Sequence, residues 1–211
     1  MTLQAIGLAC TRGERQLFSE INFELVAGDA MCVAGTNGSG KTSLLRMLCG
    51  LSFPAEGEVR WSGRNIRQSR EEFASQLIYL GHANGVKDDL FAWENLVIAA
   101  TLAGHPISRD QAYLALDQLG LEREADLPTR ALSQGQRKRV ALARLQFGMR
   151  APLWILDEPF TALDQKSVAH LCATLALHLE GGGMLVYTTH QAVELRTGRA
   201  LTLDLTQNLL C

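Results

Sequence analysis

The sequence predicts an α/β fold with a parallel-sheet core, a β-rich N-terminal layer and a helical insertion. A hydrophobic segment, 31–34, leads into a glycine-rich turn and then into an amphipathic helix. Two other apolar runs, 153–156 and 184–188, are typical of parallel strands that are covered on both faces. Between the segments 31–34 and 153–156, residues 93–149 carry apolar side chains at helical spacing. A chain of 211 residues fits one large domain or two closely packed lobes.

The remaining elements are predicted from the same patterns in chain order. Strands in the first half, separated by turn residues, are expected at 3–9, 21–25, 31–34, 57–67 (a hairpin) and 77–80. The helix after the glycine-rich turn is expected to end near Cys49, because Gly50 follows it. In the second half, a helix over about 165–179 stops at a run of glycines, and residues 200–205 form an edge strand.

The glycine-rich turn has the composition of a phosphate-binding loop. It consists of Gly35, Thr36, Asn37, Gly38, Ser39, Gly40, Lys41, Thr42 and Ser43. Glycines let successive backbone N–H groups face one concavity, and the following helix N-terminus favours a polyanion. Lys41 can reach the β- and γ-phosphates, while the hydroxyl of Thr42 or Ser43 can ligate Mg²⁺. Because strand, turn and helix are all present, we expect a nucleoside triphosphate site rather than a glycine-rich connector with a surface lysine.

Composition and charge narrow the function classes. The net charge of −2 gives no global attraction to nucleic acid, although Arg137, Lys138 and Arg139 form a local basic run. The five cysteines show no metal-ligand spacing, and Cys32 and Cys49 are predicted to be small buried side chains. The N-terminus lacks the features of a secretory signal, and no apolar run approaches the ~20 residues that cross a bilayer. A cytoplasmic protein is therefore expected, held at a membrane only by a partner.

An acidic pair, Asp157 and Glu158, directly follows the apolar run 153–156. The carboxyl end of a parallel strand is where ligands bind in an open α/β sheet. Asp157 is expected to hold Mg²⁺ through its water shell, and Glu158 to orient or deprotonate the attacking water. The alternative is that the pair caps a helix N-terminus. The phosphate loop earlier in the chain favours the ligand role.

A second motif lies at residues 132–136, which read Leu-Ser-Gln-Gly-Gln. Ser133 fits a helix N-cap, and its hydroxyl with the free N–H groups behind it forms an anion site. The segment resembles the Leu-Ser-Gly-Gly-Gln signature of ATP-binding cassette (ABC) ATPases, with Gln134 at the first glycine and Gly135 at the second. A capped amphipathic helix with an exposed basic face is the alternative. The resemblance implies that Ser133, Gly135 and Gln136 close on ATP held by a second copy, in a homodimer of cassettes.

Further matches to the ABC family follow in the expected order, from about residue 3 to residue 205. Asp164 ends a segment that resembles the D-loop, which couples the two nucleotide sites. His190 matches the switch histidine, which would donate to the γ-phosphate and help to fix Glu158 and the water. The resemblance implies a single cassette over 1–211, with a core at 1–83 and 151–211 and a helical subdomain at about 84–150. It also implies ATP and Mg²⁺ as ligands.

Two positions depart from the family pattern. His82 stands where most members carry a glutamine that ligates Mg²⁺ and senses the membrane partner. A neutral imidazole can also ligate, whereas a protonated imidazole would repel the cation. Arg12 falls where the family often places an aromatic residue that stacks on adenine. A guanidinium plane can stack on a purine too, and a solvated turn arginine is the alternative.

The single-cassette length and several segments resemble the ATP-binding subunits of bacterial cytochrome c maturation, which are described as haem exporters. These segments are 79–82, 85–87, 93–96, 159–164 and 189–191. The resemblance implies integral inner-membrane partners, which would dock near 84–93 and hold the chain at the cytoplasmic face. The process served would be haem delivery or release of a haem chaperone. A cassette for lipid or amino-acid transport remains an alternative, as does a soluble ABC protein acting on ribosomes or DNA.

Overall fold

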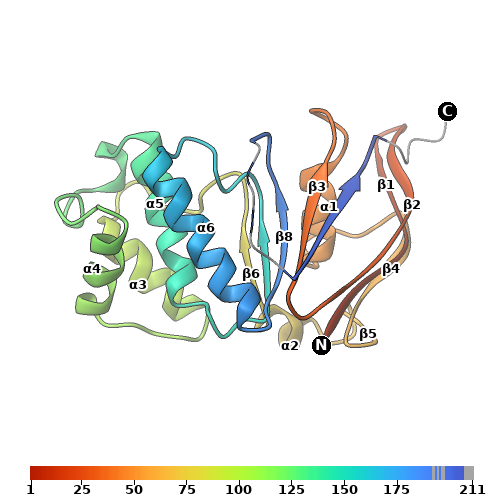
Figure 1. Cartoon of the computed structure of the whole chain (residues 1–211), viewed down its shortest axis with the longest axis horizontal. Coiled ribbons are helices and arrows are strands. Elements are labelled where there is room, and N and C mark those ends of the chain that lie inside the picture. Colours follow the sequence, from red (N-terminus) through yellow and green to blue (C-terminus); the bar gives the residue numbers. More distant parts are fainter. Residues whose placement is uncertain (192, 194, 196–197, 207–211) are drawn as a thin grey trace.

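The computed structural model describes residues 1–191, 193, 195 and 198–206. Cys211 lies outside these residues. Helices lie at one end of the molecule, a parallel sheet in the middle and an antiparallel sheet at the other end (Figure 1). Within the described part of the chain, no helix is long and apolar enough to cross a membrane.

Several of the motifs found in the sequence directly follow strands of the parallel sheet. Its described strands, in the order β6-β7-β8-β3-β9, are β6 (Leu77–Leu80), β7 (Leu153–Leu156), β8 (Met184–Thr188), β3 (Asp29–Ala34) and β9 (Arg199–Asp204). All neighbouring pairs run parallel. β7 and β8 are buried along their whole length, as their apolar sequences predict, and β9 lies at one edge. The predicted α/β fold class is confirmed.

The antiparallel sheet forms the N-terminal layer. Its described strands, in the order β2-β1-β4-β5, are β2 (Arg15–Val26), β1 (Thr2–Arg12), β4 (Glu56–Trp61) and β5 (Arg64–Asn65). The hairpin predicted at 57–67 is confirmed as β4–β5. β1 and β2 are longer than predicted, because their pairing continues through exposed residues to Arg12 and Arg15. Apolar alternation alone does not detect such solvated strand ends.

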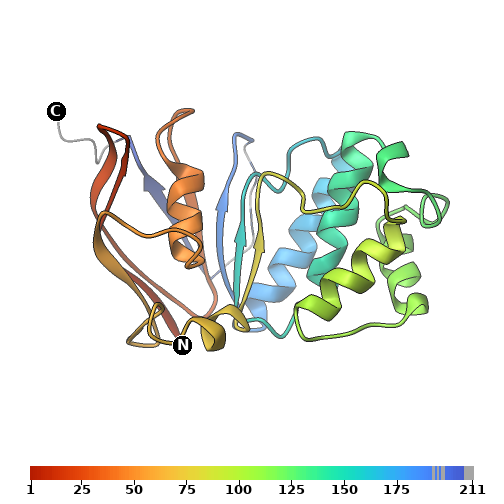
Figure 2. The ribbon, with the colours of Figure 1, turned by 180° about the vertical axis from the view of Figure 1, so that it is seen from behind.

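The described helices pack on both sides of the parallel sheet, most of them on the side away from the antiparallel sheet (Figure 2). They are α1 (Lys41–Leu48), α2 (Arg70–Ala74), α3 (Ala92–Leu102), α4 (Arg109–Gln118), α5 (Gln134–Ala143) and α6 (Gln165–Glu180), with short 3₁₀ turns at Thr129–Ala131 and Arg144–Gln146. Apolar residues of α1 share one core with both sheets. The helical stretch predicted at 93–149 is interrupted after α4, where Gly120 adopts a φ of +66° and turns the chain.

A histidine of α6, His178, is buried in the core. The ring of His178 stacks on Trp154, with centroids 3.9 Å apart and planes 7° from parallel. Its Nε2 lies 3.2 Å from the carbonyl oxygen of Met184. Burial lowers the pKa of His178 to about 4, and the hydrogen bond to Met184 only partly opposes this shift. A Cβ on Gly183 would collide with the imidazole ring, so only glycine fits there.

The pKa of His178 predicts acid lability of the fold. The unfolded chain binds a proton at this side chain below a pKa of ~6.5, whereas the folded chain binds it only below about 4. The free energy of unfolding therefore rises with pH across this window, and the stability is lost as the pH falls from ~6.5. We expect urea unfolding to give a value about 2 kcal/mol lower at pH 5 than at pH 7 because of this group. His178→Gln should flatten that slope and His170→Gln should not; an unchanged slope in the first variant would contradict the assignment.

Candidate nucleotide-binding site

The glycine-rich turn between β3 and α1 has the backbone shape that a phosphate cradle requires. Gly35 and Gly40 adopt φ angles of +144° and +100°, which side chains rarely tolerate. A Cβ on Gly35 would lie 2.5 Å from Ser39 Oγ, and one on Gly40 would lie 3.0 Å from the ring of Phe18. Ser39 Oγ is buried and has no hydrogen-bond partner. A ligand with acceptor oxygens would satisfy this hydroxyl.

Lys41 is the first residue of α1 and its side chain is folded over the turn. Its Nζ donates to the carbonyl oxygens of Gly35 at 2.8 Å and Thr36 at 3.1 Å. The ammonium group therefore lies within the loop, where a bound phosphate would meet it. A hollow of about 220 Å³ opens here and is lined by Arg12, Leu17, Asn37, Gly38, Gly40, Lys41, Thr42, Ser43 and Glu158. The structure thus brings Arg12 to the predicted loop, and its stacking role stays a prediction.

Residues from three elements meet at Asp157, which is 2% exposed and follows β7 directly. Thr42 Oγ1 donates to Asp157 Oδ2 at 2.8 Å, and Thr188 Oγ1 donates to Asp157 Oδ1 at 2.7 Å. A hydroxyl and a carboxylate are the hard oxygen ligands that suit Mg²⁺, which keeps several waters and takes substrate phosphates as its other ligands. These residues therefore fit the ion. The sequence left Thr42 and Ser43 as alternatives, and the structure places Thr42 beside Asp157.

Glu158 lies at the rim of the same strand in an uncommon backbone conformation, with φ of +48°. Its N–H donates to Thr188 Oγ1 at 2.8 Å, and its Oε2 accepts from Thr161 Oγ1 at 3.2 Å. His190 Nε2 lies 3.5 Å from Glu158 Oε1, as the predicted partnership of the two residues requires. The alternative that the acidic pair caps a helix is wrong, because the next described helix, α6, begins at Gln165.

Thr188 is a residue of this site whose role the sequence did not reveal. It ends the apolar strand β8 and is fully buried. Its hydroxyl accepts from the backbone of Glu158 and donates to the carboxylate of Asp157. One side chain thus fixes both acidic residues. A lone hydroxyl at the end of an otherwise apolar strand was the available signal.

The Ser133 turn begins α5 and has the predicted N-cap. Ser133 Oγ accepts from the N–H of Gln136 at 3.2 Å, while Gln136 Oε1 accepts from the N–H of Ser133 at 2.8 Å. This reciprocal pair is a capping box. A Cβ on Gly135 would lie 2.7 Å from the carbonyl oxygen of Ala162, so a side chain there would displace the segment that leads to Asp164. Asp164 caps α6 by accepting from the N–H of Ser167 at 2.7 Å.

A second hollow lies on the other side of Glu158. It is lined by His82, Asn84, Gln134, Lys138, Glu158, Thr161 and Ala162. The structure therefore brings His82 to Glu158, and His82 is not among the residues that line the hollow over the phosphate loop. Lys138, the middle residue of the local basic run, is only 7% exposed. Burial lowers the pKa of Lys138, and the carboxylates of Asp157 and Glu158 oppose that shift.

The position of His82 beside Glu158 makes its contribution testable. We expect His82→Ala to lower Mg²⁺-dependent ATP turnover by roughly 10-fold, about what one hydrogen bond to a charged group would contribute if His82 makes it during the reaction in the hollow that it lines with Glu158. His82→Gln, which restores an acceptor, should retain most of the turnover and full ATP binding. Steady-state phosphate release measures both. Unchanged turnover in the alanine variant would show that His82 has no part in the reaction.

The fold and the site define a nucleoside triphosphatase of the phosphate-loop class. The family model for ABC transporters matches residues 18–161. The chain therefore belongs to the ABC transporter family, and the predicted class of enzyme, an ATPase of the cassette type, is confirmed.

Relatives place the chain more narrowly within this family, and solved structures share its fold. It is 52% identical over 97% of its length to a protein of Nitrosospira multiformis named cytochrome c biogenesis ATP-binding export protein CcmA, of which the match covers 99%. It is 50% identical, over 96% of its length and 99% of the relative, to the protein of that name from Dechloromonas aromatica. The predicted resemblance is confirmed.

A putative ABC transporter ATP-binding protein from Pyrococcus furiosus matches over 100% of both chains with TM-score 0.82 at 20% identity. A dimeric bacterial ABC transporter cassette matches over 96% of this chain and 94% of that chain, with TM-score 0.82 at 24% identity.

Proposed function

We propose that this chain is the ATP-hydrolysing subunit of a transporter complex for cytochrome c biogenesis, which powers haem export or release of a haem chaperone at the inner membrane. The observation that carries the ATPase role is the network in which Thr42 and Thr188 hold Asp157 while Thr188 also holds Glu158. The cytochrome c role is supported by the near-full-length similarity to proteins named for that process.

In the proposed mechanism the phosphate loop binds ATP through its backbone N–H groups, and Lys41 exchanges its loop carbonyls for phosphate oxygens. Thr42 and Asp157 would hold Mg²⁺, which when bound supplies positive charge to the phosphates. Glu158 accepts a proton from the attacking water, and Thr188 fixes the backbone from which that carboxylate projects. His190, 3.5 Å from Glu158, donates to the γ-phosphate.

The Ser133 turn would complete the site in trans. We propose a homodimer in which Ser133, Gly135 and Gln136 of one copy close on the ATP held by the loop of the other. The N–H groups at the start of α5 favour an anion there. Asp164, next to this turn through Ala162, would couple the two sites. The parts of this single cassette would be a core at 1–83 and 151–211 and a helical subdomain at about 84–150.

The proposed partners are integral subunits of the cytochrome c maturation system, and they would hold the chain at the cytoplasmic face of the inner membrane. Segment 84–93 is the proposed docking surface, because it joins the hollow beside Glu158 to α3. Extraction with mild detergent and affinity purification of the tagged chain tests this. Co-purification of membrane subunits of the cytochrome c pathway is expected. Recovery of lipid or amino-acid transporter subunits, of ribosomes or of DNA would overturn the assignment.

A genetic experiment tests the process itself. Deletion of the gene should abolish covalent attachment of haem to c-type cytochromes, as measured by haem staining of membrane fractions. The parental gene should restore attachment, and the gene encoding Glu158→Gln should not. Normal haem attachment in the deletion strain would contradict the cytochrome c role while leaving the ATPase role standing.

A further inference from the structure

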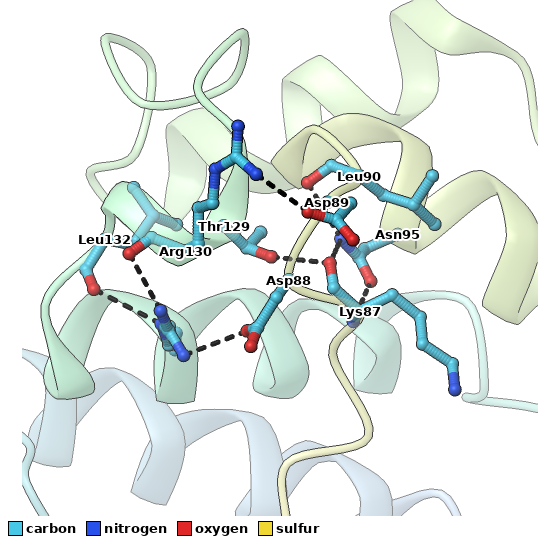
Figure 3. Close-up of polar contacts among 9 residues, drawn as sticks. Lys87, Asp88, Asp89, Leu90, Asn95, Thr129, Arg130 and Leu132 are labelled. Carbon is cyan, nitrogen blue, oxygen red and sulfur yellow. Dashed lines mark hydrogen bonds and ion pairs between the residues drawn. The ribbon is translucent and has the colours of Figure 1, made fainter.

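Part of the proposed docking surface is bound to the stretch that leads into the Ser133 turn. Residues 87–90 lie across residues 129–132 (Figure 3). The N–H of Thr129 donates to the carbonyl oxygen of Leu90 and that of Arg130 to the carbonyl oxygen of Asp88, both at 3.0 Å. These bonds join parts of the chain that are about forty residues apart in sequence. The two segments therefore move as one unit unless the bonds break.

Two buried side chains fix the beginning of this segment. Asn95 of α3 accepts from the N–H of Lys87 at 2.7 Å and donates to the carbonyl oxygens of Lys87 and Phe91 at 3.2 and 3.1 Å. Thr129 Oγ1 donates to the carbonyl oxygen of Lys87 at 2.7 Å. Thr129 is fully buried and Asn95 nearly so. Polar groups that are buried and paired in this way hold a loop firmly, because breaking a bond leaves an unpaired group without water.

Arg137 connects this unit to the Ser133 turn. Its guanidinium donates to Asp88 Oδ1 at 3.0 Å, to the carbonyl oxygen of Arg130 at 2.8 Å and to that of Leu132 at 3.3 Å. Its own N–H donates to the carbonyl oxygen of Ser133 at 2.9 Å, one turn into α5. The planar fork of arginine spreads five N–H donors over three nitrogens and can reach acceptors that lie apart, whereas the three donors of lysine share one nitrogen. The side chain of Arg137 thus bonds both the backbone that leads to Ser133 and the carboxylate of Asp88 in segment 87–90.

We propose that Arg137 and Asp88 are positioning residues, which hold the Ser133 turn in the orientation that engages the nucleotide of the second copy. This inference rests on the homodimer proposed above. A bound partner that displaces segment 87–90 then pulls on Arg137 through Asp88. Arg137 in turn shifts the backbone that it bonds just before Ser133. Capping by Ser133 and Gln136 fixes the conformation of the turn, and the bonds from Arg137 fix its orientation toward the second copy.

The neighbouring pair Asp89 and Arg130 supplies a matched control. The guanidinium of Arg130 lies 2.9 Å from Asp89 Oδ1, and these side chains are 66% and 86% exposed. Arg137 and Asp88 are 31% and 63% exposed, and Arg137 also bonds the backbone before Ser133. An exposed ion pair of this kind contributes little to the stability of the local structure. Asp88→Asn and Asp89→Asn are therefore the same chemical change at adjacent residues, with different expected results.

The test uses the full chain in a Glu158→Gln background, in which bound ATP is not consumed. ATP-driven dimerisation is measured by analytical ultracentrifugation, together with binding of a fluorescent ATP analogue to the monomer and the melting temperature. Arg137→Lys should weaken dimerisation at least 10-fold, and Asp88→Asn by a smaller factor. Asp89→Asn should match the parent. Nucleotide affinity of the monomer and melting temperature should stay near parental values in all three variants.

The outcomes separate this inference from the function on which it rests. Parental dimerisation by Arg137→Lys would overturn the positioning role. The positioning role would also be overturned if Arg137→Lys lowered the nucleotide affinity of the monomer as much as it lowered dimerisation, or if it clearly lowered the melting temperature. Either result would indicate a general structural role. The double variant Asp88→Asn/Arg137→Lys should be no weaker than Arg137→Lys alone, and additive losses would contradict joint action. A parent that stays monomeric with ATP would overturn the homodimer itself, and this inference with it.

Discussion

Glu158→Gln is expected to abolish ATP turnover and leave ATP binding intact. The amide keeps the size of the side chain and an acceptor for Thr161, but it cannot take a proton from water. Loss of a general base lowers turnover by roughly 10²–10⁴-fold. The N–H bond from this residue to Thr188 remains, so Asp157 stays in place. Phosphate release and equilibrium binding of a fluorescent nucleotide measure the two effects separately.

Glu180→Gln is the control for this experiment. Glu180 is exposed at the end of α6 and makes no part of the site, so its substitution should leave turnover and binding at parental values. Parental turnover by Glu158→Gln would show that another group accepts the proton. Loss of nucleotide binding in the same variant would contradict the separation of roles between Glu158 and Lys41.

The parts of this site that the sequence predicted depend on local chemistry. Strand β3, the glycine turn and α1 follow one another directly, and the φ angles of Gly35 and Gly40 are ones that glycine permits. The N-cap at Ser133 was predicted from its residue type, and Gln136, which completes the capping box, lies only three positions further on. Short apolar runs identified β7 and β8 because a strand buried on both faces needs no polar residue.

The parts that the sequence did not predict depend on contacts between distant residues. Thr188 bonds Asp157 across 31 positions, and the choice of Thr42 over Ser43 is made by a bond to the same carboxylate across 115 positions. Lys138 belongs to a run of three basic residues that the sequence does not tell apart, and α5 turns it toward Glu158. Residue type gives a side chain's chemistry, but only the packing of α5 against the parallel sheet decides which basic residue is buried. The same limit hid the contact between Arg137 and Asp88.

Lys41→Ala is expected to reduce ATP affinity about 100-fold, which corresponds to roughly 3 kcal/mol from lost charge-assisted hydrogen bonds. The ammonium of Lys41 now donates to two loop carbonyls, and these bonds show that the loop can hold a cation where the phosphates would lie. Alanine leaves the turn glycines and their N–H groups in place, so residual binding of the polyanion should persist. Isothermal titration calorimetry measures the affinity directly.

The cost of this substitution to the unliganded fold should be small by comparison. Loss of the lysine leaves the carbonyl oxygens of Gly35 and Thr36 without their donor, but water can reach them through the hollow above the loop. ATP at one fixed concentration should therefore raise the melting temperature of the parent and of the control Lys166→Ala, an exposed residue of α6, much more than that of Lys41→Ala. An equal rise in all three proteins would mean that the phosphates bind elsewhere, because stabilisation by a ligand follows its affinity for the folded state.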